Sequence, residues 1–81
     1  MYDEKRVENI KNSLKKDLGF KEVVFQKEVA EDLYFTAYDS KGTEDKIRVK
    51  PQLGTVFTWL QGNWRPVKGY KFLLLGANGE S

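Results

Sequence analysis

The chain has neither cysteine nor histidine among its 81 residues. Thiol nucleophiles, disulfide frameworks, zinc sites of the usual ligand sets and imidazole acid–base catalysis each need one of these residue types. An enzyme would have to use carboxylates, lysine or tyrosine, and no carboxylate pair in the sequence can be assigned catalytic work. We therefore expect a protein that is not an enzyme and that needs no cofactor and no metal.

Long apolar runs are also absent. The longest spans residues 72–75, far short of the roughly 20 residues that cross a bilayer. The residues after Met1 lack the basic and apolar regions of a secretory signal peptide. We expect no membrane span and a cytoplasmic protein as the sequence is written, or a secreted or membrane-anchored one if a signal segment was removed ahead of Met1.

The composition, 40% hydrophobic and 32% charged, is typical of a soluble globular protein. A chain of this length forms a single core, so we expect one domain over residues 1–81, with residues 76–81 as a frayed tail. Such a small domain buries only about 60% of the surface that its unfolded chain exposes. A deep ligand pocket is therefore not expected.

Charge is unevenly distributed along the chain. Residues 46–79 hold six bases and no acid, whereas residues 1–45 hold eleven acids and eight bases. The basic part also contains five aromatic residues: Phe57, Trp59, Trp64, Tyr70 and Phe72. Bases interleaved with aromatics bind polyanions and flat groups, but an ordinary sheet edge and core have the same composition.

The first part of the chain has the pattern of an amphipathic helix. Its apolar residues lie three or four positions apart: Val7, Ile10, Leu14 and Leu18. Asp3 can cap the start, and Gly19 supplies a left-handed stop. The spacing predicts a helix over residues 3–18 that lies with a narrow apolar stripe on a sheet.

After Gly19 the apolar period changes to two, which is typical of strands. In the first strand, Val23, Phe25 and Val29 share one face, opposite Glu22, Gln26 and Glu28. Further strands are expected at residues 33–38, 46–50, 55–60 and 67–75, with turns at 31–32, 39–45, 51–54 and 61–63. The inward face of 55–60 stays open between Val56/Thr58/Leu60 and Thr55/Phe57/Trp59.

The strands at 33–38 and 46–50 form a predicted hairpin. With the turn centred on Gly42, positions 38, 36 and 34 face positions 46, 48 and 50. The core side then holds Leu33, Phe35, Ala37, Ile47 and Val49, since a one-residue slip would bury the bases. We predict an α+β domain: one N-terminal helix packed on a four- to five-stranded, mostly antiparallel sheet.

The outer face of this hairpin is the first candidate site. It combines aromatic and basic side chains: Tyr34, Tyr38, Lys46, Arg48 and Lys50. Sheet-surface nucleic-acid binders use this layout, with bases stacked on aromatics and cations on phosphates. Tyrosines and lysines also simply suit an exposed strand, and the sequence contains no ribonucleoprotein signature or glycine-rich clamp loop.

The second candidate is the tight turn that carries both tryptophans and an arginine: Trp59, Trp64 and Arg65. Such residues are over-represented at binding hot spots. Tryptophans also supply core bulk to small domains. For Trp59 a core position is favoured, whereas for Trp64 partner contact and a structural role are both open.

Two groups of carboxylates are interpreted as solvated turns. Asp39, Glu44 and Asp45 lie in one predicted loop, but their spacing does not match a twelve-residue calcium loop. The pair Glu31-Asp32 is interpreted as a charged turn between strands.

The stretch Val49-Lys-Pro-Gln-Leu-Gly54-Thr-Val56, preceded by Tyr38-Asp-Ser-Lys-Gly42, resembles the third-strand ending and glycine-containing hairpin of the PepSY domain. This small α+β module often occurs near peptidases and in secreted or membrane proteins. The resemblance covers residues 5–58, with Lys50 where the family usually has aspartate. It implies a non-catalytic regulatory or inhibitory role through protein contact, and transfers no active-site residue.

We therefore expect a small interaction module that binds or inhibits a protein partner, as a monomer or as a dimer through the exposed sheet. Weak, salt-sensitive binding of single-stranded nucleic acid is the alternative.

Overall fold

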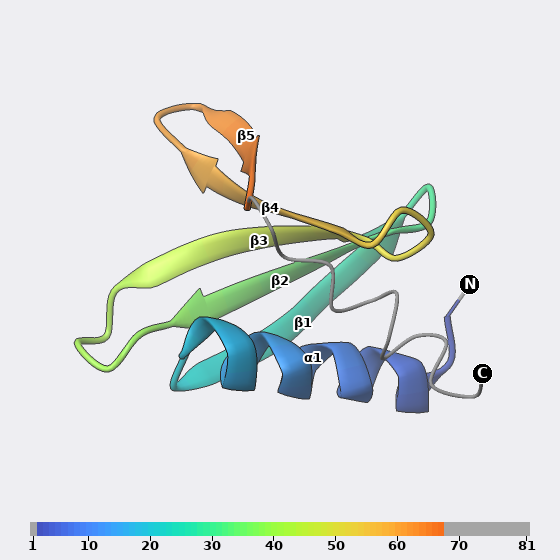
Figure 1. Ribbon diagram of the computed structural model, residues 1–81, viewed down its shortest axis with the longest axis horizontal. Helices are drawn as coiled ribbons and strands as arrows, with labels where there is room; N and C mark the ends of the chain where they lie inside the picture. The colour runs from blue at the N-terminus through green and yellow to red at the C-terminus, as the bar shows by residue number, and fades with distance from the viewer. Residues whose placement is uncertain (1, 68–81) are drawn as a thin grey trace.

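The computed structural model describes residues 2–67. One helix lies along one face of a five-stranded antiparallel sheet, and the strand order follows the order of the chain (Figure 1). The elements are α1 (Glu4–Leu18), β1 (Glu22–Val29), β2 (Asp32–Tyr38), β3 (Glu44–Lys50), β4 (Thr55–Leu60) and β5 (Asn63–Pro66). This is the predicted α+β class.

The helix ends at the predicted residue, Leu18, and begins at Glu4, one residue after the predicted start, with Asp3 as its N-cap. The Asp3 carboxylate accepts the backbone N–H of Arg6 at 2.8 Å, which satisfies one of the orphan donors of the first turn. Gly19 has a φ of 76° and donates its N–H to the Lys15 carbonyl at 3.0 Å. Among the described residues no helix has the length and apolar character needed to cross a bilayer.

The core lies between α1 and the near face of the sheet. Its buried side chains are Ile10, Leu14, Val23, Leu33, Phe35, Ala37, Ile47, Val49 and Val56. The core side predicted for the central hairpin is thus confirmed, because its five apolar residues are all in this set. The face of the sheet that points away from α1 does not contribute to this core, and the candidate site lies on it.

The first strand departs from the predicted alternation. Phe25 pairs with Phe35, but the next pair joins Lys27 to Tyr34, so Gln26 is an extra residue in a β-bulge. A bulge reverses the alternation beyond it. The prediction that Val29 shares the inner face with Val23 is therefore wrong, and Val29 is 47% exposed.

The register of the central hairpin also differs from the prediction. Tyr38 pairs with Glu44, and Tyr34 pairs with Arg48, a shift of two positions that leaves the faces unchanged. The loop closes early because the Asp39 carboxylate accepts the N–H groups of Lys41 and Thr43, both at 2.9 Å. Side chains of this type favour such local turns.

The last described strand, β5, lies at residues for which no strand was predicted. Leu60 pairs with Asn63, so the turn consists of Gln61 and Gly62 alone, with φ values of 54° and 82°. Two positive φ values in a two-residue loop are the mark of a type I′ hairpin. Pro66 lies in β5, at the edge of the described sheet, as proline requires. The strand predicted at 67–75 lies, except for its first residue, outside the described residues.

Candidate partner-binding face

The sheet surface turned away from α1 carries aromatic side chains around one arginine. We define the aromatic face as Tyr34, Arg48, Phe57, Trp59 and Trp64. The register pairs Tyr34 with Arg48, Arg48 with Phe57, and Trp59 with Trp64. Directly opposed residues share a face of a sheet, so four neighbouring strands contribute to one continuous surface.

The rings of this surface contact each other edge to face. The centroids of Trp59 and Trp64 lie 5.1 Å apart at an interplanar angle of 71°. Those of Tyr34 and Trp64 lie 5.9 Å apart at 66°. Pairs of this geometry contribute roughly 0.5–1.5 kcal/mol beyond the area that they bury. Trp64 is thus held between one ring on β4 and one on β2.

The core position favoured for Trp59 is wrong, and Trp64, for which both roles were open, is the more buried of the two. Trp59 is not in the core: its side chain faces outward and is 42% exposed, because Val56 occupies the inward position of β4 opposite Val49. Residues 55, 57 and 59 therefore point away from α1. Trp64 is half-buried. Of the two, Trp59 presents more surface to a partner.

Arg48 lies at the centre of the aromatic face. Its guanidinium carbon is 5.7 Å from the ring centroid of Tyr34, 5.9 Å from that of Phe57 and 6.0 Å from that of Trp64. These distances fall within the range of cation–π attraction. One cation therefore links rings from β2, β4 and β5, which favours a preorganised surface.

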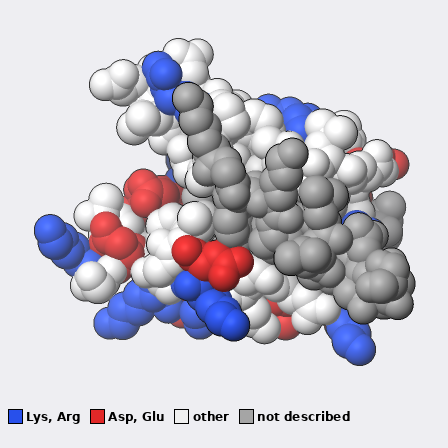
Figure 2. Space-filling view, in the orientation of Figure 1, with Lys and Arg blue, Asp and Glu red and all other residues white. Residues whose placement is uncertain are grey.

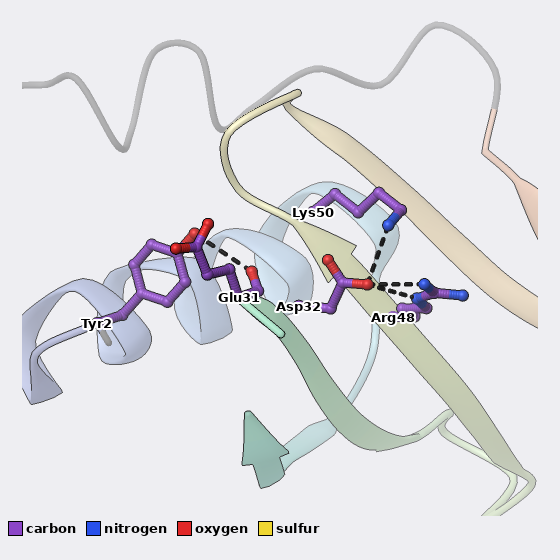
Figure 3. Close-up of polar contacts among 5 residues, drawn as sticks. All are labelled: Tyr2, Glu31, Asp32, Arg48 and Lys50. Carbon is purple, nitrogen blue, oxygen red and sulfur yellow. Dashed lines mark hydrogen bonds and ion pairs between the residues drawn. The ribbon is translucent and has the colours of Figure 1, made fainter. Parts of the chain in front are cut away.

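Asp32 anchors that cation (Figure 3). Its Oδ2 accepts hydrogen bonds from Arg48 Nη2 at 2.7 Å, from Arg48 Nε at 3.0 Å and from Lys50 Nζ at 2.9 Å. The prediction of a charged turn is wrong for this residue, which opens β2 and is only 8% exposed. It belongs to the site, and sequence analysis missed it.

The ionisation of Asp32 is set by two opposing influences. Burial alone would raise the pKa of its carboxyl. The hydrogen bonds from Lys50 and Arg48, together with their positive charges, outweigh burial and leave the pKa below its ordinary value of 3.8. At neutral pH the carboxylate is therefore charged, and it offsets part of the positive charge of the two bases.

The remaining residues of the predicted nucleic-acid face are more scattered. Tyr38 lies at the far end of the sheet, where it pairs with Glu22 and Glu44. Lys46 pairs with Thr36 and is exposed. Basic side chains also gather along the lower edge of Figure 2, where Figure 1 places α1. Within residues 2–67, the basic side chains therefore do not gather on a single surface.

Arg65 does not share the aromatic face. It pairs with Thr58, whose neighbours Phe57 and Trp59 point outward, so the alternation places Arg65 on the opposite side of the β4–β5 hairpin. Its Nε donates to the Leu60 carbonyl at 3.5 Å. The structure thus brings Trp59 and Trp64 together but separates Arg65 from them.

Away from the aromatic face, a groove of about 960 Å³ lies between α1 and β1. Val7 and Phe25 supply apolar surface there, while Glu8 and Lys11 form an ion pair at 3.4 Å. Its lining mixes acids and bases, so its charge does not indicate one class of ligand.

No family model, curated protein or solved structure matches this chain.

Proposed function

We propose that the chain is a non-enzymatic interaction module that binds, and by binding regulates or inhibits, a protein partner through the aromatic face. The observation that carries the proposal is the exposed Trp59 ring packed on Trp64, which is itself fixed by Tyr34 and Arg48. Tryptophan, tyrosine and arginine dominate binding hot spots, and preorganised side chains lose little entropy on binding. The PepSY resemblance agrees with such a role.

The test uses Trp59→Ala, because Trp59 has the more exposed side chain of the two tryptophans. Leu53→Ala is the matched control, since Leu53 is apolar, 65% exposed and located in the β3–β4 turn. We expect both variants to fold, as judged by amide NMR spectra. In crosslinking and affinity capture from the native host, Trp59→Ala should lose a partner that the control retains. Equal capture by Trp59→Ala and the unaltered protein would contradict the proposal.

Single-stranded nucleic acid is the second candidate, because bases and aromatic rings share one sheet surface. Salt-sensitive binding would predict that Arg48→Ala and Lys50→Ala lower affinity for a mixed-sequence oligonucleotide and flatten its salt dependence. Amide NMR titration at low and physiological salt measures this. Two observations favour a protein partner instead: Asp32 accepts hydrogen bonds from both bases, and Trp64 is half-buried between the rings of Tyr34 and Trp59, which leaves less of its face for a stacked base.

A further inference from the structure

A shallow depression of about 450 Å³ adjoins the aromatic face. Tyr34 and Trp64 form part of its wall, and the rest comes from β1, β2 and β3. Four polar side chains contribute to the lining: Gln26, Lys27, Thr36 and Lys46. The depression is continuous with the proposed partner-binding surface through two shared aromatic residues, but its chemistry is different.

The charge of this depression has one sign. Lys27 and Lys46 are both exposed, and no acidic residue is among its described lining. Lys27 Nζ lies 5.4 Å from the Tyr34 ring centroid, a contact that leaves ammonium donors free for a ligand. By contrast, Arg48 and Lys50 share Asp32 as an acceptor. Among the described residues of this surface, the two lysines are therefore the cations that no carboxylate engages and that can receive an incoming anion.

The polar groups around the lysines suit a peptide backbone. Gln26 is the bulge residue and has no partner on β2, and the extra residue of a bulge is left unpaired by the ladder. Thr36 adds a hydroxyl that donates and accepts. Amide, hydroxyl and ammonium groups around two apolar rings match the mixed chemistry of an extended peptide that carries carboxylates.

We propose that this depression binds an acidic peptide segment of the partner. Carboxylates of the segment bind Lys27 and Lys46, and an adjoining apolar side chain packs on Trp64 and Tyr34. The proposal rests on the proposed function and deepens it by naming the chemistry of the partner. Charge complementarity makes Lys27 and Lys46 the specificity-determining residues of the interface.

The experiment compares three probes by NMR titration of the labelled full chain at 50–150 mM salt, where the Debye length is on the order of 10 Å and direct contacts between opposite charges are still felt. The probes are a twelve-residue peptide of alternating Glu, Phe and Pro, the same peptide with Lys in place of Glu, and a twelve-nucleotide oligothymidylate. We expect the acidic peptide to shift the amides of Lys27, Tyr34, Thr36 and Lys46 and the indole N–H of Trp64. The other two probes should leave these signals unchanged.

Charge-reversal variants supply the matched control. Lys27→Glu with Lys46→Glu should weaken binding of the acidic peptide at least tenfold. Lys21→Glu with Lys41→Glu makes the same change of net charge at two exposed positions outside the depression, and should change affinity less than threefold. The amide spectrum of each variant first shows that it is folded.

Each outcome bears on the two proposals separately. Equal binding of the acidic and basic peptides, loss of affinity in both double variants alike, or binding of the oligonucleotide in preference to the acidic peptide would overturn the acidic-segment proposal. So would the absence of shifts with the acidic peptide. In these cases a host partner that still requires Trp59 would leave the proposed function standing, whereas capture that is independent of Trp59 would reject that function as well.

Discussion

Arg48 donates two hydrogen bonds, from Nη2 at 2.7 Å and from Nε at 3.0 Å, to the same carboxylate oxygen of Asp32. The donor lies in the middle of β3 and the acceptor opens β2. Because the guanidinium is held from this side, its carbon stays within 6.0 Å of three ring centroids. The ion pair between Asp32 and Arg48 thus fixes the cation around which the rings of the aromatic face are arranged.

Removal of the carboxylate should destabilise the protein. Asp32→Ala leaves Arg48 and Lys50 without their shared acceptor, and we expect a loss of about 2 kcal/mol in the free energy of unfolding. Urea denaturation followed by tryptophan fluorescence measures it. The control is Glu44→Ala, which removes an exposed carboxylate from the same hairpin and should change stability by less than about 0.5 kcal/mol. Equal losses in the two variants would show that the ion pair contributes nothing specific.

The same carboxylate should make stability fall in acid. Its pKa is lower in the folded protein than in the unfolded chain, where it is about 3.9, so the unfolded state binds more protons as the pH falls. The contribution of Asp32 is therefore complete above roughly pH 5 and is lost as the pH falls through 3.9 toward the folded-state value. Denaturation series from pH 7 to pH 2.5 should show a difference between the unaltered protein and Asp32→Asn that shrinks in this window. A constant difference would contradict the lowered pKa.

The two tryptophans should differ in their structural contribution. Trp64→Ala removes a half-buried ring with contacts to Tyr34, Trp59 and Arg48, and we expect a cost of about 3 kcal/mol. Trp59→Ala removes a ring that is 42% exposed, at a cost of about 1 kcal/mol. Thermal and urea unfolding of both variants measures the difference. Trp59→Ala as the more damaging change would place that ring in the structure and not at the interface.

The β1–β2 turn should be open to stabilisation. Ala30 and Glu31 have φ values of 52° and 70°. These values lie in the left-handed region, which residues other than Gly, Asn and Asp rarely adopt. Ala30→Asn with Glu31→Gly supplies the residues that a two-residue I′ turn prefers, and should raise the free energy of unfolding by about 1 kcal/mol. The variant loses the exposed hydrogen bond that Gln52 donates to the Glu31 carboxylate, which costs little. It keeps the backbone carbonyl of residue 31, to which the Tyr2 hydroxyl donates. A decrease in stability would show that this turn is not strained.

The sequence was sufficient for features that depend on local chemistry. The spacing from Val7 to Leu18, with Asp3 and Gly19 at the two ends, predicted α1, because capping and periodicity are properties of neighbouring residues. The inward face of β2 and β3 followed from their shared alternation. The faces remained right when the register shifted by two, since that shift preserves alternation.

Features that depend on long-range pairing were not predictable in the same way. The bulge at Gln26 has no glycine or proline to mark it, and it reversed the expected side of Val29. Asp32 next to Glu31 has the pattern of an ordinary turn. Its role appears only when β3 brings Arg48 and Lys50 beside it, and no local pattern separates it from Glu31.

The meander order of the strands has a kinetic consequence. Every strand pairing in the described residues joins neighbours in sequence, so each hairpin needs only a short loop to close. Low sequence separation between contacting residues is associated with rapid folding. During synthesis the hairpins can form one after another as they leave the ribosome. The strand β1 pairs with β2, the next strand to emerge, and does not wait for a distant one.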